Sequence, residues 1–384
     1  MIKLEKIGYS LNDVAIVQEP ESNVRSRKDV NPFITLCKKK SLPIFVAPMD
    51  SVTDENNYKI WQDNKVCPVI PRTVSQRLSL KERLRLAKST FVSFSLEEAE
   101  LLYKLVDNNN AIMHISHEYP IYVCIDIAQG TMEALYDICE KIKKSYGKSV
   151  IIMSGNIANP DAYYFYINAK IDWVRCGIGT GAVCITSSET GIHYPMASLL
   201  DEISDIREEL VNDDGNNFTY DNLPKIIADG GINGYSDINK ALALGADAVM
   251  IGKLFAQCEE ACGPEYWSHS PEHIEEGYYM GSESYNNIKD DIVDDLEVCL
   301  FKKFRKYKGM STTEAQVAMG KPGNKTTEGI TTYVEVKYPV KDFLGKAESY
   351  LRSAMSYTNS KTLEDFGLSE MIILGGSSQN VYKK

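Results

Sequence analysis

Short apolar runs alternate with longer amphipathic stretches over roughly the first 260 residues of the chain. The runs are rich in Val, Ile and aromatic residues and contain few polar positions, which is typical of strands buried on both faces of a parallel sheet. The stretches between them place apolar residues at helical spacing, as in LEEAELLYKLV, TMEALYDICEKIKKSY and SDINKALALGA. The predicted strands cover residues 44–47, 66–70, 91–93, 122–126, 151–154, 173–176, 226–228 and 248–251.

Eight strand–helix units within about two hundred residues favour a closed (β/α)8 barrel, an α/β TIM barrel, over an open sheet. Polar residues follow most of the predicted strands directly, and in such a barrel they gather at the carboxyl face, where active sites lie. We therefore predict one barrel domain over residues 1–384. The residues that follow the strands are Met49-Asp50, Arg72, Asp126, Ser154-Gly155-Asn156, the glycine loop 177–187, Asp229-Gly230-Gly231 and Gly252-Lys253.

Several segments lie outside this repeating pattern. Residues 212–221 are polar and read as a solvated loop, while residues 259–341, here called the flap segment, are long enough to cover the barrel mouth. An acidic run at 289–297 is interpreted as a surface helix of that segment. Residues 340–357 predict a helix that covers the side of the barrel, and residues 370–384 predict a disordered tail.

Composition narrows the class of protein. The apolar content of 43% and the charged content of 25% are those of a soluble globular chain. A net charge of -11 argues against nucleic acid as a partner, although it leaves room for a small anionic ligand. No run approaches the ~18 apolar residues of a membrane span, and the amino-terminal residues contain no signal-peptide core. The nine cysteines form no CxxC pair, so we expect a reducing, cytoplasmic location.

The loop at 177–187 reads GIGTGAVCITS and carries the strongest candidate chemistry. Gly177, Gly179 and Gly181 allow the backbone to approach a ligand closely. Cys184 follows, with the hydroxyl of Thr186 nearby. A thiol among backbone N–H groups favours the thiolate and is a candidate nucleophile. A lone cysteine is also often only a packed side chain, so the loop needs support from other motifs.

That support comes from a set of motifs that occur in order along the chain. Together they resemble the IMP dehydrogenase / GMP reductase family, and the resemblance covers nearly the whole sequence. The segments that carry it are APMDSVTD (47–54), IDIAQG (125–130), SGNIANP (154–160), GIGTGAVC (177–184), IIADGGI (226–232), DAVMIGKLFA (247–256), YKGMS (307–311), TEG (327–329) and LRSAMSY (351–357).

The resemblance implies a covalent mechanism and a set of roles. Cys184 would attack C2 of a purine nucleoside monophosphate, hydride would pass between that adduct and a nicotinamide cofactor, and Thr186 with Glu328 would move protons. Asp229 would hold the ribose hydroxyls. The implied nucleotide-binding residues are Met49, Asp229, Gly230, Gly231, Gly252, Tyr307, Gly309, Met310 and Ser311, and the implied cofactor-binding residues are Asp126, Ala128, Asn156, Gly177 and Gly179.

The two branches of the family differ in reaction. The resemblance is closer to the reductases, which convert GMP to IMP and ammonia with NADPH, because residues 311–327 contain no Arg-Tyr pair and no insertion follows the second strand. An NAD-dependent IMP dehydrogenase that makes XMP is the alternative, since the wording of APMDSVTD and EGITTYVEV is closer to that branch. A catalytically silent purine-nucleotide-binding regulator is a third reading. The family also implies a homotetramer, and the carbonyl groups of Gly179, Gly181 and Cys184 are candidates for a potassium ion.

Three positions depart from the family pattern. Arg72 follows Pro71 where both branches usually have His-Lys, and it is assigned a catalytic role in place of the lysine. Ala182 lacks the usual serine hydroxyl beside the phosphate, and Lys253 stands where a small residue is usual. Lys253 either replaces the lost phosphate contact with a charge-assisted one or reflects a ligand that differs from GMP, such as dGMP or a modified purine nucleotide.

Two further residues admit structural interpretations. Asp50 is placed to cap a helix that follows it, since Asp is common at that position. Arg175 lies inside a predicted strand and is interpreted as a buried hydrogen-bond donor rather than as a ligand contact.

Overall fold

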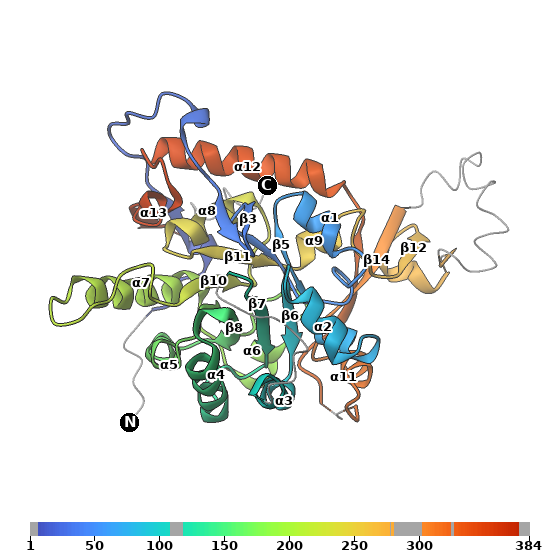
Figure 1. The fold of residues 1–384 in the computed structure, drawn as a ribbon. Coiled ribbons are helices and arrows are strands. Elements are labelled where there is room, and N and C mark those ends of the chain that lie inside the picture. Colours follow the sequence, from blue (N-terminus) through green and yellow to red (C-terminus); the bar gives the residue numbers. More distant parts are fainter. Residues whose placement is uncertain (1–6, 108–117, 277, 280–301, 324–325, 376–384) are drawn as a thin grey trace.

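The core of the molecule is a closed barrel of eight parallel strands (Figure 1). The computed structural model describes residues 7–107, 118–276, 278–279, 302–323 and 326–375. Each strand pairs with the next in the sequence, and β11 returns to pair with β4. The predicted (β/α)8 barrel is confirmed. Its strands are β4 (Ile44–Val46), β5 (Cys67–Ile70), β6 (Phe91–Phe94), β7 (Ile121–Asp126), β8 (Val150–Ile157), β9 (Trp173–Cys176), β10 (Lys225–Asp229) and β11 (Ala248–Ile251).

Side chains on the barrel strands alternate between two cores. Phe45 points into the barrel, where its ring lies 5.8 Å from that of Phe91 and 5.2 Å from that of Trp173, centroid to centroid. Its neighbours Ile44 and Val46 point outward and pack into the larger core under the helices. Because both faces are buried, the strands read as continuous apolar runs.

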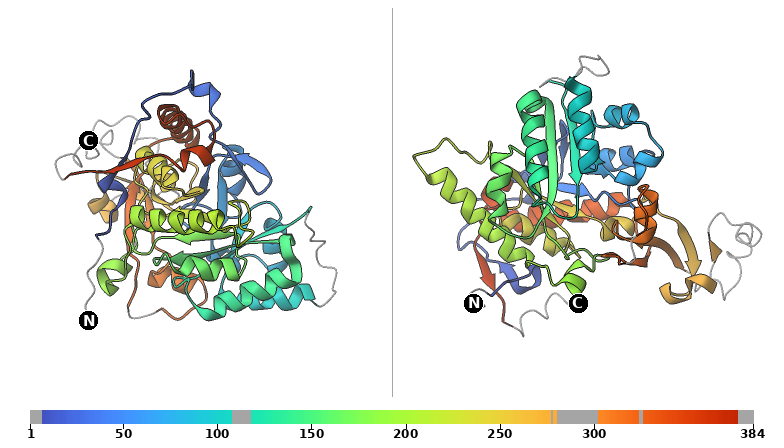
Figure 2. Two further views of the ribbon diagram at one scale, coloured as in Figure 1. Left: turned by 90° about the vertical axis from the view of Figure 1, so that its left-hand side faces the viewer. Right: turned by 90° about the horizontal axis from the view of Figure 1, so that it is seen from below.

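Helices cover the outside of the barrel (Figures 1 and 2). In α4, Leu135, Ile138 and Ile142 are buried at spacings of three and four, which is the pattern of a helix with one apolar face. The described part of the chain contains no helix long and apolar enough to cross a membrane. The helices of the barrel are α1 (Tyr58–Asp63), α2 (Leu80–Leu86), α3 (Leu96–Asp107), α4 (Glu133–Tyr146), α5 (Ala162–Asn168), α6 (Thr186–Thr190), α7 (Met196–Asn212), α8 (Tyr235–Ala243) and α9 (Lys253–Ala256).

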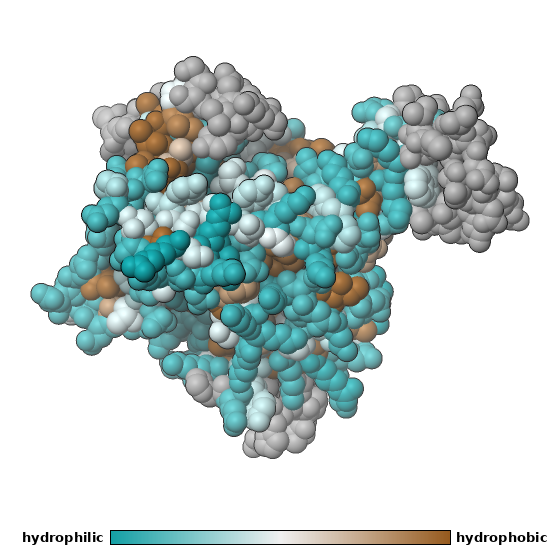
Figure 3. All heavy atoms as spheres, turned by 90° about the horizontal axis from the view of Figure 1, so that it is seen from above, coloured by the Kyte–Doolittle hydropathy of each residue, from teal (hydrophilic) through white to brown (hydrophobic). Residues whose placement is uncertain are grey.

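The two ends of the chain meet beside the barrel. The predicted helix at 340–357 is confirmed as α12 (Val340–Tyr357), which packs on α8. The face of the molecule that carries α12 is largely hydrophilic on its outer side (Figure 3). The short helix α13 (Leu363–Phe366) follows, and a hairpin of β2 (Ile34–Leu36) and β3 (Lys39–Ser41) packs Leu36 against the inner barrel cluster.

The prediction of a disordered tail over 370–384 is wrong at its start. Residues Met371–Ile373 form β16, which pairs antiparallel with β1 (Val14–Ile16). The three residues of β16 form backbone hydrogen bonds with β1, and their own sequence contains no signal that predicts this pairing. Residues 376–384 lie outside the described part of the chain. The predicted polar loop at 212–221 is confirmed over residues 213–221, which are exposed or half-buried, while Asn212 is the last residue of α7.

The described part of the flap segment forms a small antiparallel sheet next to the barrel mouth, and this sheet projects from the barrel (Figure 2). The sequence did not predict this sheet. The acidic run at 289–297 lies outside the described residues, so the surface-helix interpretation stays a prediction. The sheet consists of β13 (Tyr278–Tyr279), β12 (Glu265–Ser268), β14 (Lys302–Lys308) and β15 (Thr331–Glu335), and α11 (Thr313–Ala318) lies between β14 and β15.

Arg305 of β14 fastens this sheet to the barrel. Its guanidinium is fully buried and donates to the backbone carbonyls of Ala256, Cys258, Glu259 and Gly263. It also forms an ion pair with Glu265 of β12. The planar, five-donor guanidinium suits such a set of acceptors, which a lysine could not satisfy together.

We expect Arg305→Met to lower the free energy of unfolding by about 3–5 kcal/mol, because it leaves Glu265 and several buried carbonyls without their donor. Urea unfolding followed by circular dichroism measures the change. Lys302→Met is the matched control, since Lys302 lies on the same strand, is 58% exposed and pairs with Glu335 at 3.2 Å. Equal stability of the two variants would contradict this role of Arg305.

Candidate active site

An open cavity of about 260 Å³ lies at the carboxyl ends of the barrel strands. Loops after five of the barrel strands and the end of β8 contribute to it, together with residues of the flap segment. Most of the residues predicted from the sequence are brought together here, although they span positions 49 to 328. Those that line the cavity are Met49, Arg72, Asp126, Ala128, Asn156, Gly177, Gly179, Gly181, Cys184, Thr186, Asp229, Gly230, Tyr307, Gly309, Met310, Ser311 and Glu328.

The loop that carries Cys184 is folded tightly between β9 and α6. Gly179 has a φ of +72°, and a Cβ at this position would lie 2.5 Å from Cβ of Ser187. Only glycine fits there, because both the backbone conformation and the space exclude a side chain. Its carbonyl accepts a hydrogen bond from the Ser187 hydroxyl at 3.1 Å. The loop thus holds Cys184, which is half-buried, at the wall of the cavity.

Cys184, Thr186 and Glu328 form a chain of hydrogen bonds. The thiol of Cys184 donates to Oγ1 of Thr186 at 3.3 Å, and that hydroxyl donates to Oε2 of Glu328 at 2.7 Å. The expectation that backbone N–H groups surround the sulfur is not matched by the contacts of the described residues. The partner of the sulfur is the Thr186 hydroxyl, and the N–H of Cys184 donates to the carbonyl of Gly181 at 3.1 Å.

Backbone pairing places Glu328 beside the cysteine. Cys184 and Gly329 form an antiparallel bridge, in which the N–H of Ile185 donates to the carbonyl of Glu328 at 3.0 Å. The N–H of Ile330 donates to the carbonyl of Val183, also at 3.0 Å. These bonds fix the register between the cysteine loop and the flap segment, so the carboxylate faces Thr186.

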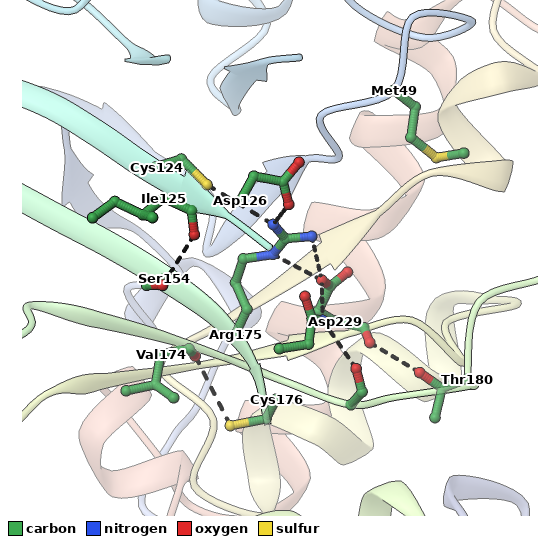
Figure 4. A network of polar contacts seen from close by, with 12 residues as sticks. Met49, Cys124, Ile125, Asp126, Ser154, Val174, Arg175, Cys176, Thr180 and Asp229 are labelled. Carbon is green, nitrogen blue, oxygen red and sulfur yellow. Dashed lines mark hydrogen bonds and ion pairs between the residues drawn. The ribbon is translucent and has the colours of Figure 1, made fainter. Parts of the chain in front are cut away.

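Arg175, which also lines the cavity, joins two aspartates (Figure 4). Nη1 of Arg175 lies 2.5 Å from Oδ1 of Asp126, and Nε and Nη2 each lie 2.9 Å from Oδ2 of Asp229. Nδ2 of Asn156 also donates to Oδ2 of Asp229, at 2.7 Å, and to the carbonyl of Gly177, at 2.9 Å. The interpretation of Arg175 as a buried donor is supported, but its acceptors are the two carboxylates predicted to bind ligands.

The neighbouring carboxylates stabilise the positive charge of Arg175. Burial by itself would lower the pKa of the guanidinium, but the carboxylates of Asp229 and Asp126 outweigh that effect and raise its pKa well above the usual value. The arginine is therefore a permanent cation, and it leaves one oxygen of each carboxylate for other partners.

Tyr307 and Met49 face each other near the loop after β11. The hydroxyl of Tyr307 donates to Sδ of Met49 at 3.3 Å. A Cβ on Gly252 would lie 2.6 Å from that hydroxyl, so a glycine is required for this approach. A thioether is a weak acceptor. The hydroxyl is thus free to exchange it for a stronger acceptor such as a phosphate oxygen.

Comparison with known proteins agrees with this arrangement. Residues 106–378 match the model of the IMP dehydrogenase / GMP reductase domain. The chain is 30% identical to the GMP reductase of Clostridium acetobutylicum, and the match covers 93% of both chains. It is 29% identical to the GMP reductases of Oceanobacillus iheyensis and Bacillus anthracis, again over 93% of each chain.

The chain belongs to the IMP dehydrogenase / GMP reductase family. It is an oxidoreductase of that type, and its low identity to these relatives makes it a divergent member. The resemblance drawn from the nine sequence motifs is thereby confirmed.

Three residues predicted for the family's nucleotide site are not among those that line the cavity. Gly231, Gly252 and Lys253 lie next to it in sequence, and Lys253 is exposed at the start of α9. Ala182, the position that lacks the family serine, is exposed as well. A phosphate contact from Lys253 therefore stays a prediction.

The predicted helix cap at Asp50 is not formed, whereas Arg72 lies at the cavity. No helix begins directly after Asp50, because the next helix starts at Tyr58 with Asn57 as its N-cap, so the capping interpretation is wrong. Asp50 instead pairs with Lys308 of β14 at 3.3 Å, and burial raises the pKa of its carboxyl even though Lys308 acts in the opposite direction. Arg72 lines the cavity as expected, and its Nη1 donates to the backbone carbonyl of Asp126 at 3.0 Å.

Several lining residues were missed by the sequence analysis. Met319 is the most informative, because it directly follows the flap helix α11 and adds a polarizable side chain to the cavity that Met310 also lines. Its position inside the segment between Met310 and Glu328 was the available signal. The others, whose apolar or glycine character gave no signal, are Ala47, Pro48, Ile127, Ile178, Val183 and Gly329.

The remaining thiols of the described residues differ from Cys184 in their surroundings. Burial raises the pKa of Cys124 to about 12 and also raises the pKa of Cys139 and Cys176. A high pKa and burial both suppress reaction, because the thiolate is the nucleophile.

We expect a small excess of iodoacetamide to modify Cys184 before the other described cysteines. Peptide mapping by mass spectrometry in a Cys299→Ser background, since Cys299 lies outside the described residues, identifies the first site. The rapid first step of labelling should be absent in the Cys184→Ala variant and present in Cys139→Ala. First labelling at Cys37 or Cys262 would contradict the assignment.

Proposed function

We propose that this chain reduces GMP, or a GMP-like purine nucleotide, to IMP with release of ammonia and oxidation of NADPH. The observation that carries the proposal is the Cys184–Thr186–Glu328 chain at the cavity wall, with distances of 3.3 and 2.7 Å. The names of the relatives, all GMP reductases, support the reductase branch.

The cysteine supplies the nucleophile and its two partners supply the proton path. Sγ of Cys184 adds to C2 of the purine while its proton passes through the Thr186 hydroxyl to Glu328. The same path returns protons to the 2-amino group, which leaves as ammonia while C2 stays bonded to sulfur. The nicotinamide, when bound, supplies the hydride that C2 takes up as the C–S bond breaks. GMP, NADPH and two protons thus give IMP, ammonium and NADP⁺.

The nucleotide side of the cavity offers the donors and acceptors that this substrate needs. Oδ1 of Asp229 has no side-chain partner within the described residues and is free to accept from the ribose hydroxyls. Gly230 lines the cavity and Tyr307 presents a weakly bonded hydroxyl, and we assign both to the 5′-phosphate together with Gly231 and Gly252. Met49, Gly309, Met310 and Ser311 are assigned to the base.

The cofactor side fits a nicotinamide dinucleotide. Oδ2 of Asp126 has no side-chain partner in the described part of the chain and is an acceptor for ribose hydroxyls. Asn156 follows Gly155, which pairs in register with Asp126 on the neighbouring strand, and Ala128, Gly177 and Gly179 add small residues to the lining. We assign NADPH rather than NAD to this side on the strength of the reductase relatives.

Other features of the family remain predictions for this chain. They include the homotetramer, the cytoplasmic location and a potassium ion held by the carbonyl groups of the cysteine loop. Two of those carbonyls, of Gly179 and Gly181, already accept one hydrogen bond each, from Ser187 Oγ and from the N–H of Cys184.

We expect oxidation of NADPH with GMP, and slow or no reduction of NAD⁺ with IMP, followed at 340 nm. A panel with dGMP and base-modified analogues tests whether Arg72, Ala182 and Lys253 accompany a different purine. Cys184→Ala should abolish turnover and keep nucleotide binding, whereas Cys139→Ala should be active. Turnover of IMP alone would assign the dehydrogenase branch, and nucleotide binding without any turnover by the wild type would assign a regulator.

Glu328→Gln and Thr186→Val should each lower kcat by about 10²–10⁴-fold, the range for loss of a general acid–base group. GMP affinity should change little, because neither side chain is assigned to ribose or phosphate. Steady-state kinetics and isothermal titration separate the two effects. Glu335→Gln, on β15 of the same flap segment, is the control that should retain wild-type kcat. Full activity of Glu328→Gln would exclude the proton path.

A further inference from the structure

A single cation lies between carboxylates that belong to two different subsites. Arg175, at the end of β9, contacts Asp126 at the end of β7 and Asp229 at the end of β10 (Figure 4). The side chains of Arg175, Asp126 and Asp229 are 9%, 16% and 13% exposed. In such surroundings two like charges are stable side by side only if a cation is shared between them.

We propose that Arg175 is a positioning residue that forms the nucleotide subsite and the cofactor subsite together, by orienting Asp229 for one and Asp126 for the other. The inference rests on the proposed function, which assigns these two carboxylates to different ligands. Arg175 itself acts through them and takes no proton in the reaction.

The contacts divide each carboxylate between protein and ligand. Arg175 uses Oδ1 of Asp126 and Oδ2 of Asp229, and this leaves the second oxygen of each without a side-chain partner in the described residues. The two free oxygens are therefore held in fixed directions by one planar group. A rotation of either carboxylate would break its bond to the guanidinium.

The two carboxylates depend on Arg175 to different degrees. Asp229 has a second side-chain donor, Asn156, at 2.7 Å. The carboxylate of Asp126 has no other side-chain donor among the described residues, since Arg72 bonds to the backbone carbonyl of Asp126 and not to its carboxylate. Loss of Arg175 should therefore disturb the cofactor subsite more than the nucleotide subsite.

Arginine is needed because one group must reach two acceptors in different directions. The guanidinium offers donors on separate edges of a plane, whereas a lysine ammonium is a point charge on a flexible stem. A lysine at this position would pair with one carboxylate at a time and leave the other without a cation.

The test measures binding of both ligands to the full chain. NADPH binding is followed by its fluorescence, and GMP binding by isothermal titration. Arg175→Lys should raise the Kd of GMP and of NADPH, each by about tenfold or more, as expected for loss of an oriented, charge-assisted contact, with the larger effect on NADPH. The matched control is Arg207→Lys, because Arg207 is a buried arginine paired with Asp247 at 3.0 Å away from the cavity. The control should leave both Kd values unchanged.

A rescue variant separates positioning from a general structural role. In the double variant Arg175→Lys/Asp126→Asn, Asp229 is the only carboxylate left for the lysine to pair with. The affinity for GMP should therefore return toward the wild-type value, while the affinity for NADPH stays low. If Arg175→Lys is insoluble, the comparison of Asp126→Asn with the double variant carries the same test, and the two should bind GMP equally.

Four outcomes would overturn the proposal. The first is unchanged affinity for both ligands in Arg175→Lys, with a lowered Tm like that of Arg207→Lys, which would make Arg175 structural. The second is a loss confined to GMP, which would tie Arg175 to Asp229 alone. The third is a double variant that binds GMP more weakly than Asp126→Asn. The fourth is a wild-type chain that binds neither GMP nor NADPH, which would reject the proposed function and this inference with it.

Discussion

Closure of the barrel between β11 and β4 is the constraint on which the site depends. Parallel strands that form a ring present all their carboxyl ends at one rim, so each loop that follows a strand faces the same cavity. Residues as distant in sequence as Met49 and Asp229 meet there because their strands are separated only by β11 in the ring. The rings of Phe45, Phe91 and Trp173 pack together inside the barrel, and the loops start from the strand ends that this closed ring places at the rim.

Two buried arginines organise the polar groups at this rim in different ways. The guanidinium of Arg305 donates to backbone carbonyls and to Glu265, and these bonds connect the flap sheet to the barrel. Arg175 donates to the carboxylates of Asp126 and Asp229, which also line the cavity. A buried cation must be fully paired to be tolerated, which explains why both are arginines with several acceptors each. The first arrangement fixes structure, and the second leaves acceptor oxygens for ligands.

The nucleophile and its proton path come from two separate parts of the chain. Cys184 and Thr186 lie on one loop. Glu328 belongs to the flap segment and is placed beside them by the backbone pairing of Gly329 with Cys184. A half-buried thiol with a hydroxyl neighbour differs from the deeply buried thiols of Cys124 and Cys176, whose pKa values are raised by burial. The site thus combines groups from both parts of the chain, and Arg305 and Lys308 of β14 bind the described part of the flap segment to the barrel.

The amino-acid sequence predicted the barrel, the order of its strands and the identity of the cysteine loop. It could do so because continuous apolar runs, helical spacing and glycine positions are local signals, and because the nine motifs have a fixed order. Even the helix at 340–357 was visible, since its apolar face repeats at helical spacing.

Which side chains share partners became clear only in the folded molecule. Asp50 read as a helix cap but pairs with Lys308, which lies far away in sequence, and Met371–Ile373 read as a disordered tail but form a strand against β1. The flap sheet and the sharing of Arg175 between Asp126 and Asp229 were likewise invisible beforehand. Such contacts depend on distances between segments that only the closed barrel brings together, and a local pattern contains no record of those distances.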